Sequence, residues 1–339
     1  MNDTIEVLIA LPFPDKLIER LTEISPRLKF TVKSPNKPDD ISPDLWAHTE
    51  VLYTARVLPT AELAPNLRWI QFHWAGVDHA IDDPILRKPD LVATTLSGAA
   101  ISQMAEYAVM MLLALGRHMP ELVTLQNRSE WPHDRWERFT PIELRGSTVG
   151  IIGYGSIGRQ LARLLSYFGA TVLATKRDAK HPQDSGYIPE GMGDQGGDYV
   201  RRLYPAQALR TMLKACDFVV VCVPKTPGTI NLIKAEELAA MKPSAYLVDV
   251  SRGGIVDQQA LLAALKDHKI AGAALDVFPE EPLPAKSPFW KLPNVLITPH
   301  ISGITSHYDD RAVELFSANL LRYLAGQPLY NRIDPKLGY

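Results

Sequence analysis

The chain has 339 residues, of which 46% are hydrophobic and 22% are charged, as in ordinary globular proteins. Its 36 basic and 38 acidic residues give a net charge of −2, so we expect neither nucleic acid nor an anionic membrane as a partner. The segment 1–14 has no basic stretch, and no apolar run approaches the roughly 20 residues that span a bilayer. We therefore expect a cytoplasmic protein of two domains. Cys216 and Cys222 are expected to be buried thiols and support neither a disulfide nor a metal site.

Short apolar segments alternate with helical segments along the chain, which predicts an α/β fold with parallel sheets. In the first part we expect strands at 6–11, 28–32, 51–55, 67–72 and 91–95. A helical segment follows at 101–128, within which Pro120 is expected to start a second helix. Further strands are expected at 148–153, 171–175, 217–223, 245–250, 272–278 and 294–300.

The last helical segment, 304–326, is expected to pack back on the first domain. This predicts two Rossmann-like domains: a discontinuous, flavodoxin-like substrate domain of residues 1–98 plus 304–339, and an inserted dinucleotide-binding domain of residues 99–303. The segment 178–205 is rich in Gly, Pro and Asp and long for a connection. A solvated surface loop is the favoured interpretation, with a lid or an oligomer contact as the alternative.

The segment GYGSIG has the G-x-G-x-x-G spacing of a dinucleotide-binding turn, between an expected strand and an expected helix. Its first glycine would permit the tight turn, its second the approach of the pyrophosphate, and its third a close helix–strand contact. The helix would direct its amino-terminal N–H groups at the phosphates. The alternative is a tight turn without a ligand. The candidate residues are Gly153, Tyr154, Gly155, Ser156, Ile157 and Gly158.

The residues after the strand expected at 171–175 bear on the choice between NAD and NADP. An acidic residue there would bind the ribose 2′-hydroxyl of NAD, but this chain has Lys176 and Arg177, and Asp178 comes late. Because a cationic pair can neutralise a 2′-phosphate, we expect NADP(H), with NAD(H) as the alternative. In that alternative the two cations are solvated charges at the rim of the sheet.

Arg252, Glu281 and His300 follow three successive expected strands, so they would meet at one edge of a parallel sheet. Arg252 can bind a carboxylate with two parallel hydrogen bonds. His300 can exchange a proton with the oxygen on C2 of a keto or hydroxy acid, and Glu281 would orient it. Each residue alone also fits a structural role, whereas the ordered set after a dinucleotide turn indicates hydride transfer to or from a small acid.

These segments resemble the D-isomer-specific 2-hydroxyacid dehydrogenases over nearly the whole chain. The resemblance rests on 148–158, CVPKTPGTINLI (222–233), VDVSRGGIVD (248–257), ALDVFPEEPLP (274–284), ITPHISG (297–303), WAGVDHA (74–80) and the terminal segment 329–339. The lack of an acidic residue directly after 171–175 is similar to the glyoxylate/hydroxypyruvate reductase branch, which prefers NADPH. Asp249 departs from the family pattern, in which asparagine is frequent, and so does the length of the segment 178–205.

The resemblance implies site residues in both domains. Arg252 would clamp the substrate, His300 would be the acid/base and Glu281 its partner, while the N–H groups of Gly76 and Val77 would bind the substrate carboxylate. Asp276 would meet the nicotinamide carboxamide, and Thr229 would lie near the phosphates. Other residues expected to line the cofactor are Val223, Pro224, Ser251 and Gly303, together with Arg252 and His300.

The sequence therefore predicts a homodimeric oxidoreductase that reduces a short 2-keto acid, such as glyoxylate or hydroxypyruvate, to the D-2-hydroxy acid. The alternative is a nucleotide-sensing scaffold like the co-repressor relatives, which could retain the same three residues without significant turnover. Arg56 would add a second cation to the substrate cleft if it faced inward, but surface exposure is favoured. Core packing is the expectation for each of Trp46, Trp74, Trp131 and Trp136, with a cleft or dimer contact as the alternative.

Overall fold

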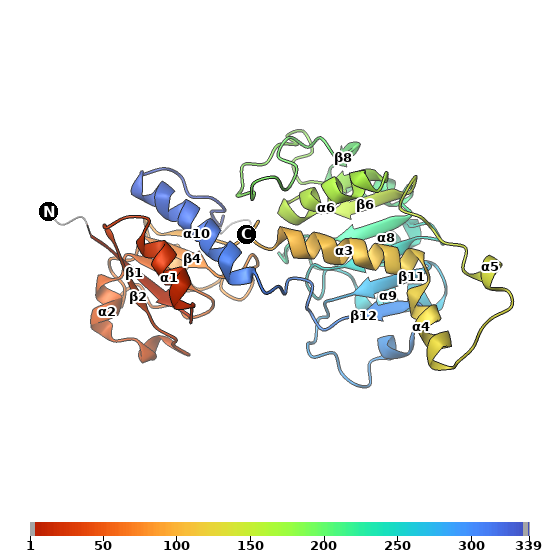
Figure 1. The fold of residues 1–339 in the computed structure, drawn as a ribbon, viewed down its shortest axis with the longest axis horizontal. Helices are drawn as coiled ribbons and strands as arrows, with labels where there is room; N and C mark the ends of the chain where they lie inside the picture. Colours follow the sequence, from red (N-terminus) through yellow and green to blue (C-terminus); the bar gives the residue numbers. More distant parts are fainter. Residues whose placement is uncertain (1–3, 335–337, 339) are drawn as a thin grey trace. The chain divides into compact units, whose positions relative to one another are not determined.

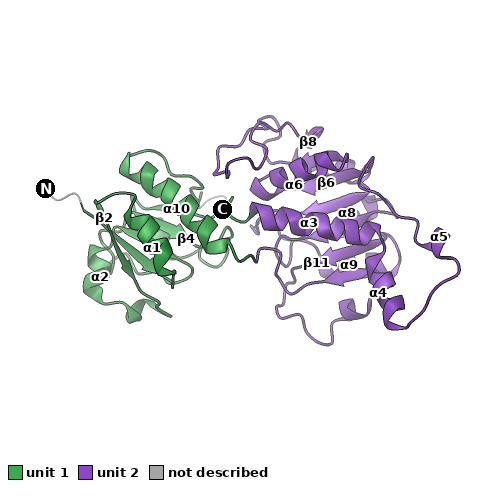
Figure 2. Ribbon diagram, viewed as in Figure 1, with its two compact units in different colours: residues 1–100, 305–339 green, residues 101–304 purple. Residues whose placement is uncertain are grey.

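The chain divides into two compact units in the computed structural model, which describes residues 4–334 and 338. Unit 1 comprises residues 1–100 and 305–339, and unit 2 comprises residues 101–304 (Figure 2). The boundaries predicted from the sequence, after 98 and after 303, lie two residues and one residue earlier. Residues 335–337 and 339 of the terminal segment lie outside the described residues.

Unit 1 is built on a five-stranded sheet in the order β2-β1-β3-β4-β5. All pairs of strands in it are parallel, and the order reverses between β1 and β3, as in flavodoxin-like folds. Its strands are β1 (Ile5–Ala10), β2 (Leu28–Val32), β3 (Val51–Thr54), β4 (Trp69–Phe72) and β5 (Val92–Thr94).

Helices cover both faces of this sheet. On one face α1 (Asp15–Thr22) and α10 (Tyr308–Leu324) bury Leu17 and Phe316 against β1, β3 and β4. On the other face α2 (Pro43–His48) buries Trp46 among side chains from the same strands. The carboxyl-terminal helix thus completes the core that the first 100 residues begin (Figure 1).

Unit 2 is built on a seven-stranded sheet in the order β12-β11-β10-β9-β6-β7-β8, again with parallel pairs only. The predicted fold class, α/β with two parallel sheets, is confirmed. Here the order reverses between β6 and β9, where Rossmann folds bind their dinucleotide. The strands are β6 (Thr148–Ile152), β7 (Thr171–Thr175), β8 (Arg202–Tyr204), β9 (Phe218–Val221), β10 (Tyr246–Asp249), β11 (Gly272–Leu275) and β12 (Val295–Ile297).

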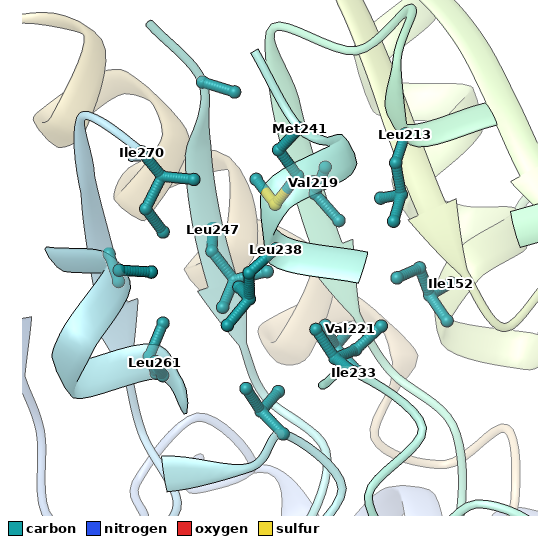
Figure 3. Close-up of a cluster of buried hydrophobic side chains, with 14 of the residues drawn as sticks. Ile152, Leu213, Val219, Val221, Ile233, Leu238, Met241, Leu247, Leu261 and Ile270 are labelled. Carbon is teal, nitrogen blue, oxygen red and sulfur yellow. The ribbon is translucent and has the colours of Figure 1, made fainter. Parts of the chain in front are cut away.

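Helices cover both faces of the sheet of unit 2, while the short helix α5 stands apart from it on the loop that joins α4 to β6 (Figure 1). Figure 3 shows apolar side chains from α7, α8 and α9 gathered over β9 and β10. On the opposite face α3 runs beside α6 (Figure 1), and Gly116 of α3 approaches the ring of Phe218. These helices are α3 (Ile101–Gly116), α4 (Met119–Asn127), α5 (Arg135–Arg138), α6 (Ser156–Tyr167), α7 (Leu209–Leu213), α8 (Ala235–Ala240) and α9 (Gln258–Lys266). Short 3-10 helices occur at Pro38–Asp40, Pro84–Arg87, Ala206–Ala208 and Pro288–Lys291.

The predicted helical segment 101–128 is divided as expected, because Pro120 lies in the first turn of α4 and cannot continue α3. No single helix in residues 4–334 and 338 is long and apolar enough to cross a membrane. By length and composition α3 and α4 together could cross a membrane, but the two helices are bent by 66° relative to each other.

The strand β8 was not predicted, because its residues belong to the segment expected to be a loop. Residues 176–201 connect β7 to β8 without a helix, although parallel strands are usually joined by one. The favoured interpretation as a surface loop fits residues 178–201, most of which are exposed or half-buried, whereas Asp194 is 3% exposed and accepts a hydrogen bond from Tyr154 outside the segment. We call residues 178–201 the crossover segment.

Asp249 places a carboxyl group inside the core of unit 2, at the end of β10. Its Oδ1 accepts hydrogen bonds from the Ser251 N–H, at 3.0 Å, and from the Ser251 hydroxyl. Burial, opposed by the hydrogen bonds from Ser251 and assisted by the nearby Asp276 carboxylate, raises the pKa of the Asp249 carboxyl to about 7. The folded state therefore holds this proton far above the pH at which an unfolded chain releases it.

We expect Asp249→Asn to stabilise the protein above neutral pH. Since the pKa is raised in the folded state, the wild type loses stability as the pH rises from about 4 to about 7, and the loss is complete above that. The advantage of the asparagine should be near zero at pH 4 and reach about 4 kcal/mol at pH 8, because a pKa rise of about 3 corresponds to ~4 kcal/mol. Urea denaturation midpoints across this range measure it, with the exposed Asp267→Asn as control. An advantage that does not change with pH would contradict the assignment.

Candidate active site

The glycine turn joins β6 to α6 in the way the sequence predicts. Gly153 has a φ of +108°, and a Cβ there would lie 2.8 Å from the Val223 side chain. A Cβ on Gly158 would lie 2.3 Å from the Gly153 carbonyl oxygen, so this glycine permits close contact of helix and strand. A Cβ on Gly155 would meet no atom within 4 Å. The turn thus leaves space at its second glycine, where a pyrophosphate would approach the first N–H groups of α6.

The strands beside the turn hold it in place. The N–H groups of Gly153 and Tyr154 donate to the hydroxyl and carbonyl oxygens of Thr175 on β7. On the other side the Cys222 thiol donates to the Gly153 carbonyl oxygen at 3.2 Å. Burial raises the pKa of this thiol to about 12, so Cys222 is protonated near neutral pH.

The residues expected near the phosphates lie on the loop after β9. Val223 and Pro224 follow this strand, and Val223 contacts the glycine turn. The Thr229 hydroxyl donates to the Pro224 carbonyl oxygen at 2.7 Å and accepts from the Thr226 N–H at 2.8 Å. The Thr229 hydroxyl therefore stabilises the turn of residues 224–229 in this structure.

The cations after β7 differ in their surroundings. The Lys176 ammonium donates to two carbonyl oxygens of the crossover segment, those of His181 and, at 2.9 Å, Gln183. Arg177 is exposed, and Asp178 pairs with His181 at 2.6 Å. Lys176 is thus tied to the crossover segment, which sequence reasoning did not anticipate.

His300 is held in an unusual backbone conformation. Its φ of +54° lies in the left-handed region, which costs energy for a residue with a side chain and is typical of functional sites. The buried Asp276 at the end of β11 stabilises this loop: its carboxylate accepts from Thr298 at 2.6 Å and from the N–H groups of Ile301 and Ser302, each at 2.9 Å. Its carbonyl oxygen accepts from the His300 N–H at 2.9 Å.

Glu281 and His300 are in direct contact, as the sequence predicts. His300 Nδ1 lies 2.8 Å from Glu281 Oε2, and the other carboxylate oxygen accepts from the Phe278 N–H at 2.9 Å. Because a carboxylate only accepts, Nδ1 is the donor, and Nε2 is the nitrogen that can exchange a proton with a substrate. The His300 side chain is 43% exposed, so a ligand can reach it.

Arg252 lies on the loop after β10, which packs tightly on the loop after β11. A Cβ on Gly253 would lie 2.0 Å from the Phe278 carbonyl oxygen, so only glycine permits this approach. Arg252 is half-buried and donates to the Ser251 carbonyl oxygen at 2.9 Å. The close packing brings the arginine loop against the segment that carries Glu281.

Gly76 and Val77 belong to unit 1, where they follow β4. Within the described part of the chain their N–H groups make no hydrogen bond, so each is available to an anion. The loop is anchored by His73, whose Nδ1 lies 2.8 Å from the Tyr53 hydroxyl and whose carbonyl oxygen accepts from Tyr308 at 2.9 Å. Burial lowers the pKa of His73 to about 4, so this histidine is neutral near pH 7.

Several residues of these sites were missed by sequence reasoning. Gln103 donates to the Gly303 carbonyl oxygen at 3.1 Å, and the Tyr107 hydroxyl bonds to Thr298. Both lie on α3, some 200 positions from their partners, and no local pattern marks them. His73 could have been suspected from its place directly before the segment 74–80. Arg56 is exposed, as favoured. The core expectation holds for Trp46 and is wrong for Trp74, Trp131 and Trp136, which are 40%, 81% and 78% exposed.

Comparison with known proteins identifies the family. Residues 109–302 match the family model described as D-isomer specific 2-hydroxyacid dehydrogenase, NAD binding domain. A glyoxylate reductase from Thermofilum pendens is 36% identical over 268 residues, which are 78% of this chain and 74% of the relative.

Two solved structures extend the similarity over 99% of the chain and 100% of each neighbour. One is a D-isomer specific 2-hydroxyacid dehydrogenase from Xanthobacter autotrophicus Py2 in complex with NADPH and MES, 28% identical with a TM-score of 0.80. The other is an NADPH-dependent glyoxylate/hydroxypyruvate reductase from Sinorhizobium meliloti in complex with NADP and sulfate, 26% identical with a TM-score of 0.78. The chain therefore belongs to the D-isomer specific 2-hydroxyacid dehydrogenase family of NAD(P)-dependent oxidoreductases.

Proposed function

We propose that this protein reduces a short 2-keto acid, such as glyoxylate or hydroxypyruvate, to the D-2-hydroxy acid with NADPH. The observation that carries the proposal is the 2.8 Å contact of His300 with Glu281, on the same sheet as the glycine turn. The names of the Thermofilum pendens and Sinorhizobium meliloti relatives support the substrate class.

In this mechanism the chain's own residues bind the acid and move one proton. The Arg252 guanidinium and the N–H groups of Gly76 and Val77 would bind the substrate carboxylate. His300 Nε2 would donate a proton to the ketone oxygen during reduction, while Glu281 holds the ring through Nδ1. The nicotinamide, when bound, would supply the hydride to C2. Asp276, which already orders the His300 loop, would be the neighbour of the carboxamide.

The cofactor would lie along the carboxyl ends of β6, β7 and β9. The glycine turn, residues 153–158, would bind the pyrophosphate, and Val223, Pro224, Thr229, Ser251 and Gly303 would line the remaining path. Lys176 and Arg177 would bind the 2′-phosphate, which favours NADP(H) over NAD(H). The NADPH and NADP complexes of the two similar structures support this preference.

We expect His300→Ala to lower kcat with glyoxylate and NADPH by about 10²–10⁴-fold, because the proton donor is lost. Arg252→Ala should raise KM as well as lower kcat, because the clamp acts in binding and in the transition state. Steady-state oxidation of NADPH with glyoxylate, hydroxypyruvate and pyruvate measures both.

His133→Ala is the matched control, since it removes an exposed histidine from the same unit. Near-normal kinetics of either site variant would refute the roles assigned to them. If the wild type oxidised neither NADPH nor NADH with any of these acids, the scaffold alternative would be favoured instead.

We expect Arg177→Gln to lower kcat/KM for NADPH by about tenfold or more and to leave that for NADH nearly unchanged, because only NADPH carries the 2′-phosphate. The same assay with both cofactors measures this change. Lys180→Gln removes another exposed cation nearby and serves as control. A wild type that prefers NADH would overturn the cofactor proposal and leave the family assignment intact.

The homodimer is also part of the proposal. Apolar side chains are exposed along α3, α4 and the following segment: Met110, Leu113, Met119, Val123, Trp131 and Trp136. Apolar surface of this kind, gathered on neighbouring elements, is typical of protein interfaces and fits a second copy of the chain.

We expect the wild type to sediment as a dimer at micromolar concentration. Trp131→Ala should weaken self-association about tenfold or more, since exposed tryptophans are frequent hot spots of interfaces. Trp290→Ala is the control, because this tryptophan is also exposed in unit 2 but lies outside that surface. A monomeric wild type would rule the dimer out.

A further inference from the structure

The crossover segment, residues 178–201, is ordered by buried polar side chains in place of a helix. Asp194 is at its centre: Oδ1 accepts from the N–H groups of Gly197 and Asp198, at 3.0 and 2.7 Å, and Oδ2 accepts from the Tyr199 N–H at 3.0 Å. Backbone groups that a helix would have satisfied are thus satisfied by one carboxylate.

Asp194 also ties the segment to the glycine turn. Its Oδ2 accepts a hydrogen bond from the hydroxyl of Tyr154, the residue between the first two glycines of the turn. Tyr154 is 3% exposed, and the Arg159 guanidinium stacks on its ring at 4.6 Å. The turn and the segment therefore share one buried polar cluster.

Arg159 and Gln160, in the second turn of α6, bind the crossover segment through hydrogen bonds. The Arg159 side chain is 1% exposed and donates to the carbonyl oxygens of Asp194 and Pro182, each at 2.5 Å. Its Nε lies 3.4 Å from the Asp184 carboxylate. Gln160 accepts from the Gly193 N–H at 2.7 Å. Burying an arginine side chain costs free energy, so we infer a functional reason for a buried arginine beside the glycine turn.

The same segment holds Lys176. Two of the three N–H donors of its ammonium go to the carbonyl oxygens of His181 and Gln183, which leaves one donor for a phosphate oxygen. A lysine side chain that is fixed before binding loses less entropy when a ligand arrives. Lys176 directly follows β7, the position from which Rossmann folds read the ribose of the cofactor.

We propose that the crossover segment forms a wall of the adenosine end of the cofactor site, and that Asp194 is a positioning residue that sets selectivity for the 2′-phosphate. Through Tyr154 and Arg159 it fixes the segment, and through the segment it fixes Lys176. This inference rests on the proposed function for the dinucleotide site, and it adds a selectivity element outside the residues that would touch the cofactor.

The test measures binding without turnover. Dissociation constants of 2′,5′-ADP and 5′-AMP are determined by calorimetry for the full-length wild type, Asp194→Asn, Lys176→Met and the double variant. The wild type should bind 2′,5′-ADP more tightly than 5′-AMP. Asp194→Asn should lower that preference about threefold or more, and Lys176→Met about tenfold. The double variant should lose no more than Lys176→Met alone, because Asp194 acts through Lys176.

Glu190→Gln is the matched control, since it removes an exposed carboxylate from the same segment, and it should keep the wild-type preference. A merely structural role for Asp194 would lower the melting temperature and weaken both nucleotides equally, which would overturn the proposal. Additive losses in the double variant would overturn it as well.

Two further results separate this inference from the proposed function. If the wild type binds neither fragment nor NADPH, both fail. If NADPH is bound and turned over while the preference is unchanged in Asp194→Asn, only this inference fails. Should Asp194→Asn not fold, Tyr154→Phe removes a single hydroxyl donor to the same carboxylate. That variant should lower the preference in the same direction, and an unchanged preference would count against the proposal.

Discussion

Every strand of the seven-stranded sheet runs in the same direction, so the carboxyl ends of all strands lie on one edge. Because of this common direction, one edge of the sheet carries the glycine turn after β6, Arg252 after β10 and Asp276 after β11. A parallel sheet buried on both faces also supplies rigid strand ends, against which short loops can be fixed by a few hydrogen bonds. The chemistry of the family needs both properties, since a hydride and a proton must reach neighbouring atoms of one small acid.

Much of this fold could be predicted because burial on both faces makes each strand a continuous apolar segment. The expected strands agree with those observed to within a few residues, for example at 28–32 and 171–175. β8 escaped prediction because it has only three residues, Arg202–Tyr204, in a stretch rich in Gly, Pro and Asp. The buried cluster around Asp194, in the segment before β8, has members that are distant in sequence and carry no periodic pattern.

The site was predictable in its residue types and less so in its geometry. The order of Arg252, Glu281 and His300 after a dinucleotide turn was enough to indicate the reaction, and the contact of Glu281 with His300 follows that expectation. The left-handed backbone of His300 could not be predicted from the sequence, because it depends on which N–H groups donate to the Asp276 carboxylate. Local sequence identifies which groups are present, whereas long-range hydrogen bonds decide how they are held.

Two buried carboxylates organise the two ends of the cofactor domain in the same physical way. Asp276 accepts hydrogen bonds from the loop of His300, and Asp194 accepts them from the crossover segment beside Lys176. Each satisfies several backbone N–H groups at once, so each loop is ordered before any ligand arrives. Asp276 follows β11, and Asp194 lies in the connection from β7 to β8. In the sheet β11 and β7 are separated by β10, β9 and β6, and the two carboxylates share no hydrogen-bond partner among the described residues. We therefore expect that changes at Asp194 or Lys176 can alter the preference between cofactors while the contact of His300 with Glu281 is retained.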